Sequence, residues 1–398
     1  MTSDLEHSRS WEICRELVAF DTVPERSNVA AAQWAADVLD RAGWTVRWVR
    51  DHALGADKAT VLAWAGPQAP GGLLLSGHLD VVPWETQRGW TRPALELGRD
   101  DRRMYGRGVA DMKGFVAGCL ELAERLDRKQ LSRPVALLLT CDEEPGCLGI
   151  ARQLEEIGRL MREIPTPSEA VLGEPSSWHV FSAHRGHVRL PVTVLGRGGH
   201  SSRPDLGINA IDAAADAVAA VRRLAGTMAA RASERARRLY PQHPAVPFNV
   251  GTIRGGVAIN MIPEACEVAL GFRPAEPREI SALLAELKDA IGAAVKAAHP
   301  EARVEYGEPV ITPPLVPGPE GPTARALRML TGQDEFLGAP YATDAAHLQQ
   351  LGMSCYIWGP GELEQAHQPD ESLLLSSFAA LPSRLETLVY RTCVQPSA

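Results

Sequence analysis

Three short apolar runs in this sequence each lead directly into histidine or carboxylate residues, and this pattern restricts the fold more than any other feature. Apolar runs of this length are typical of buried strands. Open α/β sheets bind their ligands beyond the carboxyl ends of such strands. We therefore predict an α/β fold with a functional site along one sheet edge. The runs and the polar residues after them are 73–75 with His78 and Asp80, 135–140 with Asp142, Glu143 and Glu144, and 170–172 with Glu174.

Helical and strand patterns alternate along the rest of the chain, as in layered α/β folds. The composition changes near residue 185, after which the order strand, helix, two strands, helix predicts a compact α+β unit inserted into a larger domain. The basic segment 227–238 is expected to extend a helix or to be mobile. The expected helices are 11–20, 28–42, 112–128, 208–224, 278–299, 323–330 and 373–391; the other expected strands are 45–49, 59–63, 187–195, 248–253, 267–272 and 354–358.

Charge and composition exclude several classes of partner. The chain has 41 Lys and Arg against 49 Asp and Glu, a net charge of −8, so we expect no nucleic-acid or membrane partner. No apolar run approaches the roughly 18 residues that span a bilayer. The polar N-terminal stretch does not resemble a secretory signal, and none of the seven cysteines forms a C-x-x-C pair. We therefore expect a cytoplasmic location.

The candidate site residues are regularly spaced. Asp80, Asp111, Glu143 and Glu174 are separated by 31, 32 and 31 positions, and each interval is about the length of one strand and one helix with their loops. Their side chains can therefore converge on one sheet edge. Several carboxylates in one cleft repel one another unless a cation neutralises them. Together with His78, this mixed nitrogen and oxygen set favours zinc, cobalt or manganese.

Each of these residues also has an ordinary structural explanation. A lone histidine at a strand end is often a hydrogen-bonded structural residue. The acidic residues 142–144 could form a solvated loop or a helix cap, and Asp111 could cap the helix that follows it. All of these explanations would have to hold together, which favours the metal site.

Six stretches resemble the motifs of the M20 metallopeptidase family, and they occur in the family's order. The resemblance implies a mixed-sheet, three-layer catalytic domain of the zinc-exopeptidase type, formed by residues 1–186 and 312–398. It also implies an inserted α+β lid and dimerisation domain, residues 187–311. The stretches are 76–83 (Ser-Gly-His-Leu-Asp-Val-Val-Pro), 105–114 (Tyr-Gly-Arg-Gly-Val-Ala-Asp-Met-Lys-Gly), 142–144 followed by Gly146, 173–175 (Gly-Glu-Pro), 198–204 (Gly-Gly-His-Ser-Ser-Arg-Pro) and 366–371 (Ala-His-Gln-Pro-Asp-Glu).

The resemblance implies two divalent metal ions, with Zn²⁺ as the first choice and Co²⁺ or Mn²⁺ as alternatives. Asp111 would bridge them. His78 and Glu174 would complete the ligands of one ion, and Glu144 and His367 those of the other.

The resemblance also implies roles for two further acidic residues. Glu143 would be the general base that activates the attacking water. Asp80 would accept the second N–H of the His78 imidazole and so fix its tautomer.

In the inserted domain, the resemblance assigns His200 to the partner subunit's active site, where it would stabilise the oxyanion. Asn260 and Arg273 would bind a substrate carboxylate. The alternatives are a loop histidine without reach and a surface arginine at a strand end. Thr343 and Asp344 are further candidates for lining the pocket.

Within the family, residues 105–115, 200–209 and 359–371 resemble the acetylornithine deacetylases most closely. This implies hydrolysis of N2-acetyl-L-ornithine to L-ornithine and acetate, a step of arginine biosynthesis, by a homodimer joined through the lid. Aminoacylase, succinyl-diaminopimelate desuccinylase and carboxypeptidase or dipeptidase activities stay open. A non-catalytic metal-binding dimer is a further alternative, although Glu143 would then have no evident task.

Overall fold

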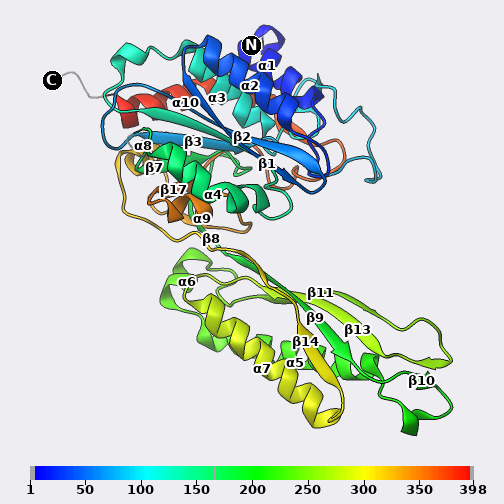
Figure 1. The fold of residues 1–398 in the computed structure, drawn as a ribbon. Helices are drawn as coiled ribbons and strands as arrows, with labels where there is room; N and C mark the ends of the chain where they lie inside the picture. Colours follow the sequence, from blue (N-terminus) through cyan, green and yellow to red (C-terminus); the bar gives the residue numbers. More distant parts are fainter. Residues whose placement is uncertain (1–4, 165–166, 395–398) are drawn as a thin grey trace. The chain divides into compact units, whose positions relative to one another are not determined.

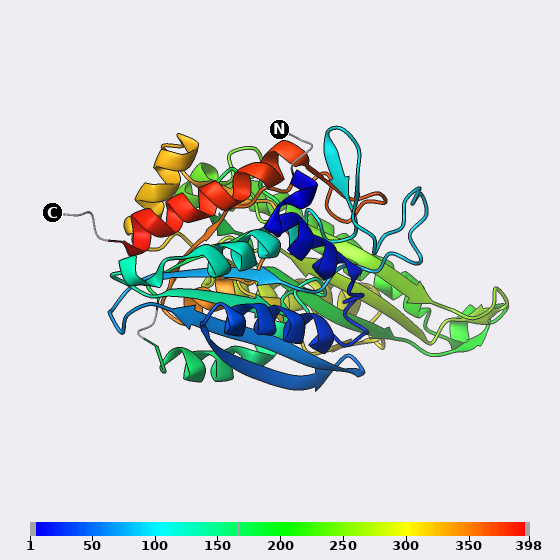
Figure 2. The same ribbon diagram turned by 90° about the horizontal axis from the view of Figure 1, so that it is seen from above.

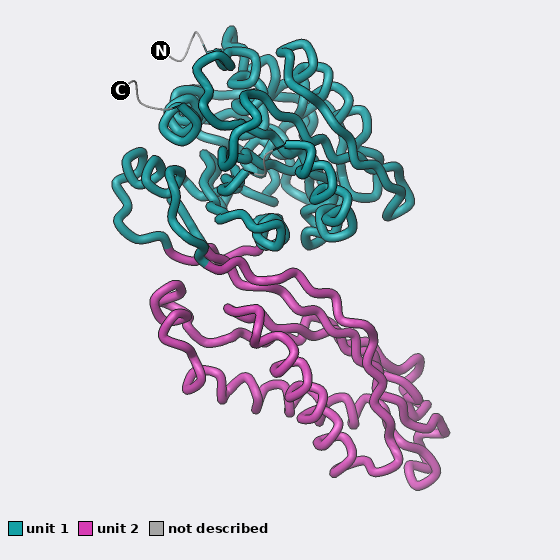
Figure 3. Tube along the Cα trace, turned by 60° about the vertical axis from the view of Figure 1, so that its left-hand side comes forward, with its two compact units in different colours: residues 1–182, 317–336, 343–398 teal, residues 183–316, 337–342 magenta. Residues whose placement is uncertain are grey.

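The chain forms two compact units in this computed structural model, which describes residues 5–164 and 167–394 (Figure 3). The first unit comprises residues 1–182, 317–336 and 343–398, and the second comprises 183–316 and 337–342. From the sequence, we expect the boundaries after residues 186 and 311. Segment 337–342 joins the second unit, which no local sequence signal indicated. Residues 1–4 of the polar N-terminal stretch lie outside the described part.

A mixed eight-stranded sheet forms the centre of the first unit (Figure 1). The last two strands of this sheet include residues that are assigned to the second unit. Neighbouring strands β3, β6 and β7 are parallel to one another, whereas β1 and β2 pair antiparallel. The strand order is β1 (Thr45–Ala53), β2 (Ala56–Ala65), β6 (Val135–Thr140), β3 (Leu73–His78), β7 (Glu169–Leu172), β17 (Ser354–Ile357), β8 (Phe181–His184) and β16 (Leu337–Ala339).

Burial explains why the middle strands are so apolar. Every residue of β3, β6 and β7 is buried, because helices cover both faces of the sheet. In Figures 1 and 2, α1, α2, α3 and α10 lie over one face, and Figure 1 shows α4 and α9 against the other. The unit's helices are α1 (Arg9–Ala19), α2 (Val29–Arg41), α3 (Lys113–Arg125), α4 (Leu148–Met161), α8 (Pro322–Thr331), α9 (Ala345–Gln350) and α10 (Leu375–Cys393).

A small antiparallel sheet in the first unit brings distant segments together. Strand β5 (Arg103–Tyr105) pairs with β4 (Gly98–Arg99) on one side and with β18 (Ser372–Leu374) on the other. This pairing holds the chain just after residue 371 beside the segment that leads to Asp111.

The second unit is a sheet with two long helices on one face (Figure 1). Asn209 caps α5 by accepting hydrogen bonds from the backbone of Ile211 and Asp212. The main sheet has the order β11 (Phe248–Gly255), β13 (Ala265–Phe272), β9 (His187–Leu195) and β14 (Arg303–Tyr306), with β15 (Val310–Thr312) also on β9. The remaining elements are the ribbon β10 (Gly199–His200) with β12 (Met261–Ile262), and α5 (Ala210–Arg231), α6 (Glu234–Leu239) and α7 (Glu279–Ala298).

The predicted α/β class is confirmed, and the expected helices and strands are present with shifted ends. The basic segment 227–238 is helical throughout most of its length, split between the end of α5 and α6. Helix α4 was not expected, although its buried residues recur at helical spacing. Strands β14 and β15 were also not predicted. Both are short, and each forms a strand by pairing with β9, a contact that the local sequence does not indicate. No helix in the described ranges is long and apolar enough to cross a membrane.

Candidate metal centre

The sheet edge predicted from the apolar runs is where the polar residues gather. His78 ends β3, and Glu143 and Glu144 follow β6 in the loop before α4. Glu174 follows β7 after a glycine whose Cβ would lie only 1.9 Å from the Phe115 ring, so the chain can make this close approach only without a side chain. Because β3 is hydrogen-bonded in parallel to both β6 and β7, the three loops share one edge.

Asp111 connects two groups of candidate ligands. Its Oδ1 is 3.1 Å from His78 Nε2, and its Oδ2 is 3.2 Å from His367 Nε2. The first group is His78, Asp111 and Glu174, and the second is Asp111, Glu144 and His367. Within each group the ligand atoms lie within 4.8 Å of one another. A carboxylate that offers one oxygen to each group has the arrangement of a bridging ligand.

The pKa values of the groups show how strongly these charges interact. Hydrogen bonds with Asp111 and Glu144 raise the pKa of His367 to about 10. Burial and the neighbouring Asp111 raise the pKa of Glu144 to about 7, and burial also raises the pKa of Glu174 well above its usual value. Burial opposes ionisation of Asp111 as well, but the two histidines hold its pKa well below the ordinary range.

The only basic side chains within the described cluster are its two histidines. Among the described residues, no lysine or arginine forms an ion pair with His78, Asp111, Glu144, Glu174 or His367. Three mutually close carboxylates with two imidazoles supply the mixed oxygen and nitrogen ligands that suit zinc and similar divalent ions. The residues present therefore fit a pair of divalent metal ions.

Glu143 lies beside the two ligand groups but belongs to neither. Its side chain is buried, and burial together with Glu174 raises its pKa well above the usual value. A buried carboxylate next to a metal pair can exchange a proton with a bound water, as a general base requires.

The carboxylate of Asp80 contacts the loop that carries Glu144. Its Oδ2 accepts a hydrogen bond from the Glu144 backbone N–H at 3.0 Å. His78 Nδ1 lies 2.9 Å from the backbone oxygen of Asp80 and 3.7 Å from its Oδ1. The carbonyl is therefore the nearer acceptor for the imidazole, and the Asp80 side chain orients the neighbouring ligand loop.

Glu371 holds the Asp111 loop by its backbone. Its carboxylate accepts hydrogen bonds from the N–H groups of Gly108, Ala110 and Asp111 at 2.9–3.1 Å and pairs with buried Arg107 at 2.8 Å. His367 lies four positions before Glu371, with φ of 62°, and its carbonyl accepts a bond from Gln87. Non-glycine residues at positive φ persist only where surrounding contacts enforce them. These contacts hold the two loops that carry Asp111 and His367 close to each other.

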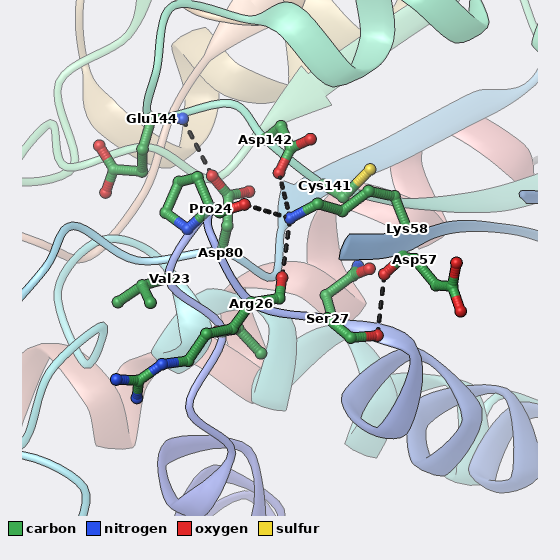
Figure 4. A network of polar contacts seen from close by, with 12 residues as sticks. Val23, Pro24, Arg26, Ser27, Asp57, Lys58, Asp80, Cys141, Asp142 and Glu144 are labelled. Atoms are coloured by element: carbon green, nitrogen blue, oxygen red, sulfur yellow. Dashed lines mark hydrogen bonds and ion pairs between the residues drawn. The ribbon is translucent and has the colours of Figure 1, made fainter. Parts of the chain in front are cut away.

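A buried lysine that sequence reasoning missed lies behind the metal loops (Figure 4). Lys58 of β2 is 2.9 Å from Asp142 Oδ1 and donates to the carbonyls of Pro24 and Arg26. The other oxygen of Asp142 pairs with Arg152 at 2.7 Å. A single lysine in a strand pattern normally indicates an exposed position, so no local signal marked Lys58.

Two of the predicted lid residues lie together in the second unit. His200 pairs with Met261 across the β10–β12 ribbon, and Ser201 N–H donates to the Asn260 carbonyl at 3.1 Å. The His200 ring is exposed, and its Nδ1 accepts from the backbone N–H of Ser202 at 3.2 Å. In the neutral ring the proton is therefore on Nε2, which can act as a donor.

Arg273 lies at the other end of β13 from this ribbon. The eight residues of that strand span roughly 26 Å at about 3.3 Å per residue. Arg273 lines a groove of about 400 Å³ on the sheet together with His187 and Arg189. Burial, followed by the two arginines, lowers the pKa of His187 to about 4, so this ring is neutral at pH 7.

Two candidate cation-binding groups that share one carboxylate, with a further buried carboxylate beside them, fit a metal-dependent amide hydrolase. The protein family is identified by comparing the sequence with models of known families. Residues 74–391 match the peptidase family M20/M25/M40, and the chain belongs to that family.

Known relatives support this assignment at the level of sequence and of fold. An acetylornithine deacetylase from Salmonella arizonae is 36% identical over 374 residues, which cover 91% of this chain and 92% of that protein. The Saccharomyces cerevisiae dipeptidase Dug1p has a similar fold, with a TM-score of 0.77, 14% identity and coverage of 100% and 98%. The Sulfolobus solfataricus M20 carboxypeptidase Sso-CP2 has a TM-score of 0.76 and 16% identity, and the match covers 97% of this chain and 99% of that protein.

Proposed function

We propose that the protein removes the N-acetyl group from an acylated amino acid, with N2-acetyl-L-ornithine as the first candidate substrate. The main support for hydrolysis by an activated water is the position of Glu143, which is buried beside the two groups that share Asp111 without belonging to either. The substrate is supported by the 36% identity to an acetylornithine deacetylase over nearly the whole chain. On this proposal the protein serves arginine biosynthesis in the cytoplasm.

Two divalent metal ions, Zn²⁺ in the first instance, would polarise the scissile carbonyl and lower the pKa of a bound water. His78, Asp111, Glu144, Glu174 and His367 would hold them. Glu143 takes a proton from the attacking water and passes it to the leaving nitrogen. The water oxygen adds to the carbonyl carbon to give a tetrahedral oxyanion. The amide C–N bond then breaks as this oxyanion collapses and the nitrogen takes the proton from Glu143, and the products are acetate and the free amino acid.

His200 supplies a hydrogen-bond donor for the oxyanion in this proposal. Ser202 occupies its Nδ1, which leaves the Nε2 proton available for a developing negative charge. The ring is exposed on the ribbon of the second unit and can therefore meet a substrate held elsewhere.

Arg273 and Asn260 are proposed to bind the substrate's α-carboxylate. Arg273 lines the groove on the β9–β13 face, and among the described residues no carboxylate pairs with it. A guanidinium presents two parallel donors to a carboxylate. The groove's neutral His187 offers a further hydrogen-bonding group.

We propose a homodimer formed through the second unit. His200 and Asn260 lie at one end of β13 and Arg273 at the other, so one copy of this unit cannot place all three around one small substrate. The ribbon end also exposes apolar side chains, with Val257 at 86% and Ile259 at 102% exposure. Burying them against a second copy removes apolar surface from water and lets two chains complete each site.

The first experiment measures amine release from N-acetyl-ornithine by chelated protein, before and after zinc or cobalt is added back. Metal-dependent release supports the proposed reaction and substrate. A panel of N-acetyl-methionine, N-succinyl-diaminopimelate and a dipeptide is assayed in parallel. Faster metal-dependent hydrolysis of any of these would replace N2-acetyl-L-ornithine as the proposed substrate while leaving the chemistry intact.

The general base is tested by Glu143→Gln. This variant should lose turnover by at least about 10³-fold, because general-base catalysis contributes factors of this order, while metal content stays at the wild-type level. Glu155→Gln, at an exposed position on α4, is the matched control. Near-normal turnover by Glu143→Gln would exclude the assignment.

A further inference from the structure

A third group of possible cation ligands lies next to the metal centre. Glu143, Cys147 and Asp344 each offer one ligand atom, and these atoms lie within 4.8 Å of one another. The three residues are 8%, 1% and 2% exposed. This group contains a thiol, which the two groups that share Asp111 lack.

A tight turn folds Cys147 back over Glu143. The N–H groups of Gly146 and Cys147 both donate to the Glu143 carbonyl, at 2.8 and 2.6 Å. Cys147 has a φ of 60° and directly precedes α4. Its Sγ donates to Glu143 Oε1 at 3.3 Å. The thiol and the carboxylate are therefore held side by side by the backbone.

Asp344 completes the group from the start of α9. Its Oδ2 accepts a hydrogen bond from Thr140 Oγ1 at 2.8 Å. Its Oδ1 is buried and accepts no hydrogen bond from the residues that the structure describes. A buried carboxylate oxygen without a donor is costly, and a cation is one of the few partners that can satisfy it.

We propose that Glu143, Cys147 and Asp344 form a third site, which binds a thiophilic divalent cation such as Zn²⁺ or Cd²⁺. One thiolate and two carboxylates are ligands that these ions accept in tetrahedral geometry, with water in the fourth position. Binding transfers the thiol proton to solvent, and no redox change occurs. Since the site engages Glu143, its occupation inhibits hydrolysis; this consequence rests on the proposed function, whereas the binding does not.

The test is a Cd²⁺ titration of protein that already carries two equivalents of zinc. Thiolate–cadmium coordination gives an ultraviolet charge-transfer band. Cadmium that displaced zinc from the main centre would give none, because neither of those ligand groups contains cysteine. We expect one equivalent of band-forming cadmium beyond the two bound zinc ions, with turnover falling in parallel.

Two variants and one control decide the site. Cys147→Ser and Asp344→Asn preserve side-chain volume, and each should raise the half-saturating Cd²⁺ concentration at least about tenfold. Cys147→Ser should also abolish the band. Cys119→Ala is the control, because this buried thiol of α3 belongs to none of the three groups, and it should behave as wild type.

Absence of the band in wild-type protein, or a band that survives Cys147→Ser, would overturn the proposal. A band without inhibition would leave the cation site standing and contradict the role of Glu143 as the base. The absorbance is read without substrate, so the binding result does not depend on which acyl amino acid the enzyme hydrolyses.

Discussion

Asp142 and Glu144 lie on the same loop, but the buried clusters around them compensate negative charge in different ways. In the Lys58 cluster, formed by Lys58, Asp142 and Arg152, the protein supplies its own cations at 2.9 and 2.7 Å from the two oxygens of Asp142. In the metal centre, no described lysine or arginine pairs with the carboxylates, and two of them have raised pKa values.

The difference shows what distinguishes a structural ion pair from a ligand site. Asp142 and Glu144 are two positions apart and both are largely enclosed, so sequence distance and burial do not separate them. What separates them is the kind of basic partner: Asp142 pairs with a lysine and an arginine, whereas Glu144 pairs with a histidine, a side chain that can also bind a metal ion. Desolvated charge must be compensated from within the chain or by an ion from outside.

Breaking the metal centre has the largest expected effect. Asp111→Asn removes the charge that both ligand groups share, so both ions should bind much more weakly and turnover should fall by at least about 10³-fold, as expected for loss of metal catalysis. Metal content measured by mass spectrometry and turnover check this. Asp289→Asn, at an exposed position on α7, is the control. Full metal content in Asp111→Asn would contradict the bridging role.

Breaking the Lys58 cluster should act on stability. Lys58→Met leaves Asp142 buried with only Arg152, and removing one partner of a buried pair costs about 3–5 kcal/mol. Urea unfolding of chelated protein measures this, with exposed Lys129→Met as the control. Asp142→Asn in the same chain should recover part of the loss. If Lys58→Met unfolds at the wild-type urea concentration, the cluster does not stabilise the fold.

His347 sharpens the comparison, because it is buried with neither an ion-pair partner nor a place in the ligand groups. Burial lowers the pKa of His347 to about 4, below its ordinary 6.5. Between these values the unfolded chain binds a proton that the folded chain does not. Stability is therefore lost as pH falls from 6.5 towards 4, by at most about 3 kcal/mol.

The variant His347→Gln should have a flatter pH dependence over this window, measured as the difference in unfolding free energy between pH 7 and pH 5. Exposed His52→Gln, whose ring is on β1, is the control. Equal slopes for wild type and His347→Gln would show that this ring binds a proton equally well in the folded and the unfolded chain.

An exposed pair gives the smallest expected effect. Arg231 and Glu286 form two bonds of 2.8 and 2.9 Å, but their side chains are 45% and 41% exposed. Water already solvates both charges, so Arg231→Gln should change the unfolding free energy by about 0.5 kcal/mol or less. A loss near that of Lys58→Met would mean that geometry, rather than burial, decides the strength of these pairs.

The gathering of polar residues at one sheet edge could be predicted from the sequence because its signals are local. Each apolar run is completely buried and is followed within a few positions by its candidate ligand. The same short segment therefore predicts both the strand and the polar side chain at its end. Lys58 and Arg107 carried no such signal. Their burial depends on partners such as Asp142 and Glu371, which lie 84 and 264 positions away along the chain. Such long-range contacts are determined by tertiary packing.

Cys147 illustrates a third situation. In the sequence it is one of seven scattered cysteines without a metal-binding spacing. Its place beside Glu143 follows from a turn at positive φ, and the third member of the group comes from a helix almost two hundred positions later. Asp344 was a candidate pocket residue, but its pairing with a thiol required the fold.

The contacts of Glu371 determine when, during synthesis of the chain, the Asp111 loop can take up its final conformation. The backbone that presents Asp111 is held by a carboxylate 260 positions later in the chain. His367, a candidate ligand, lies in the same segment. Most of the central sheet is synthesised well before either residue. A nascent chain therefore carries only part of the candidate ligand set until residues 367–371 have been synthesised.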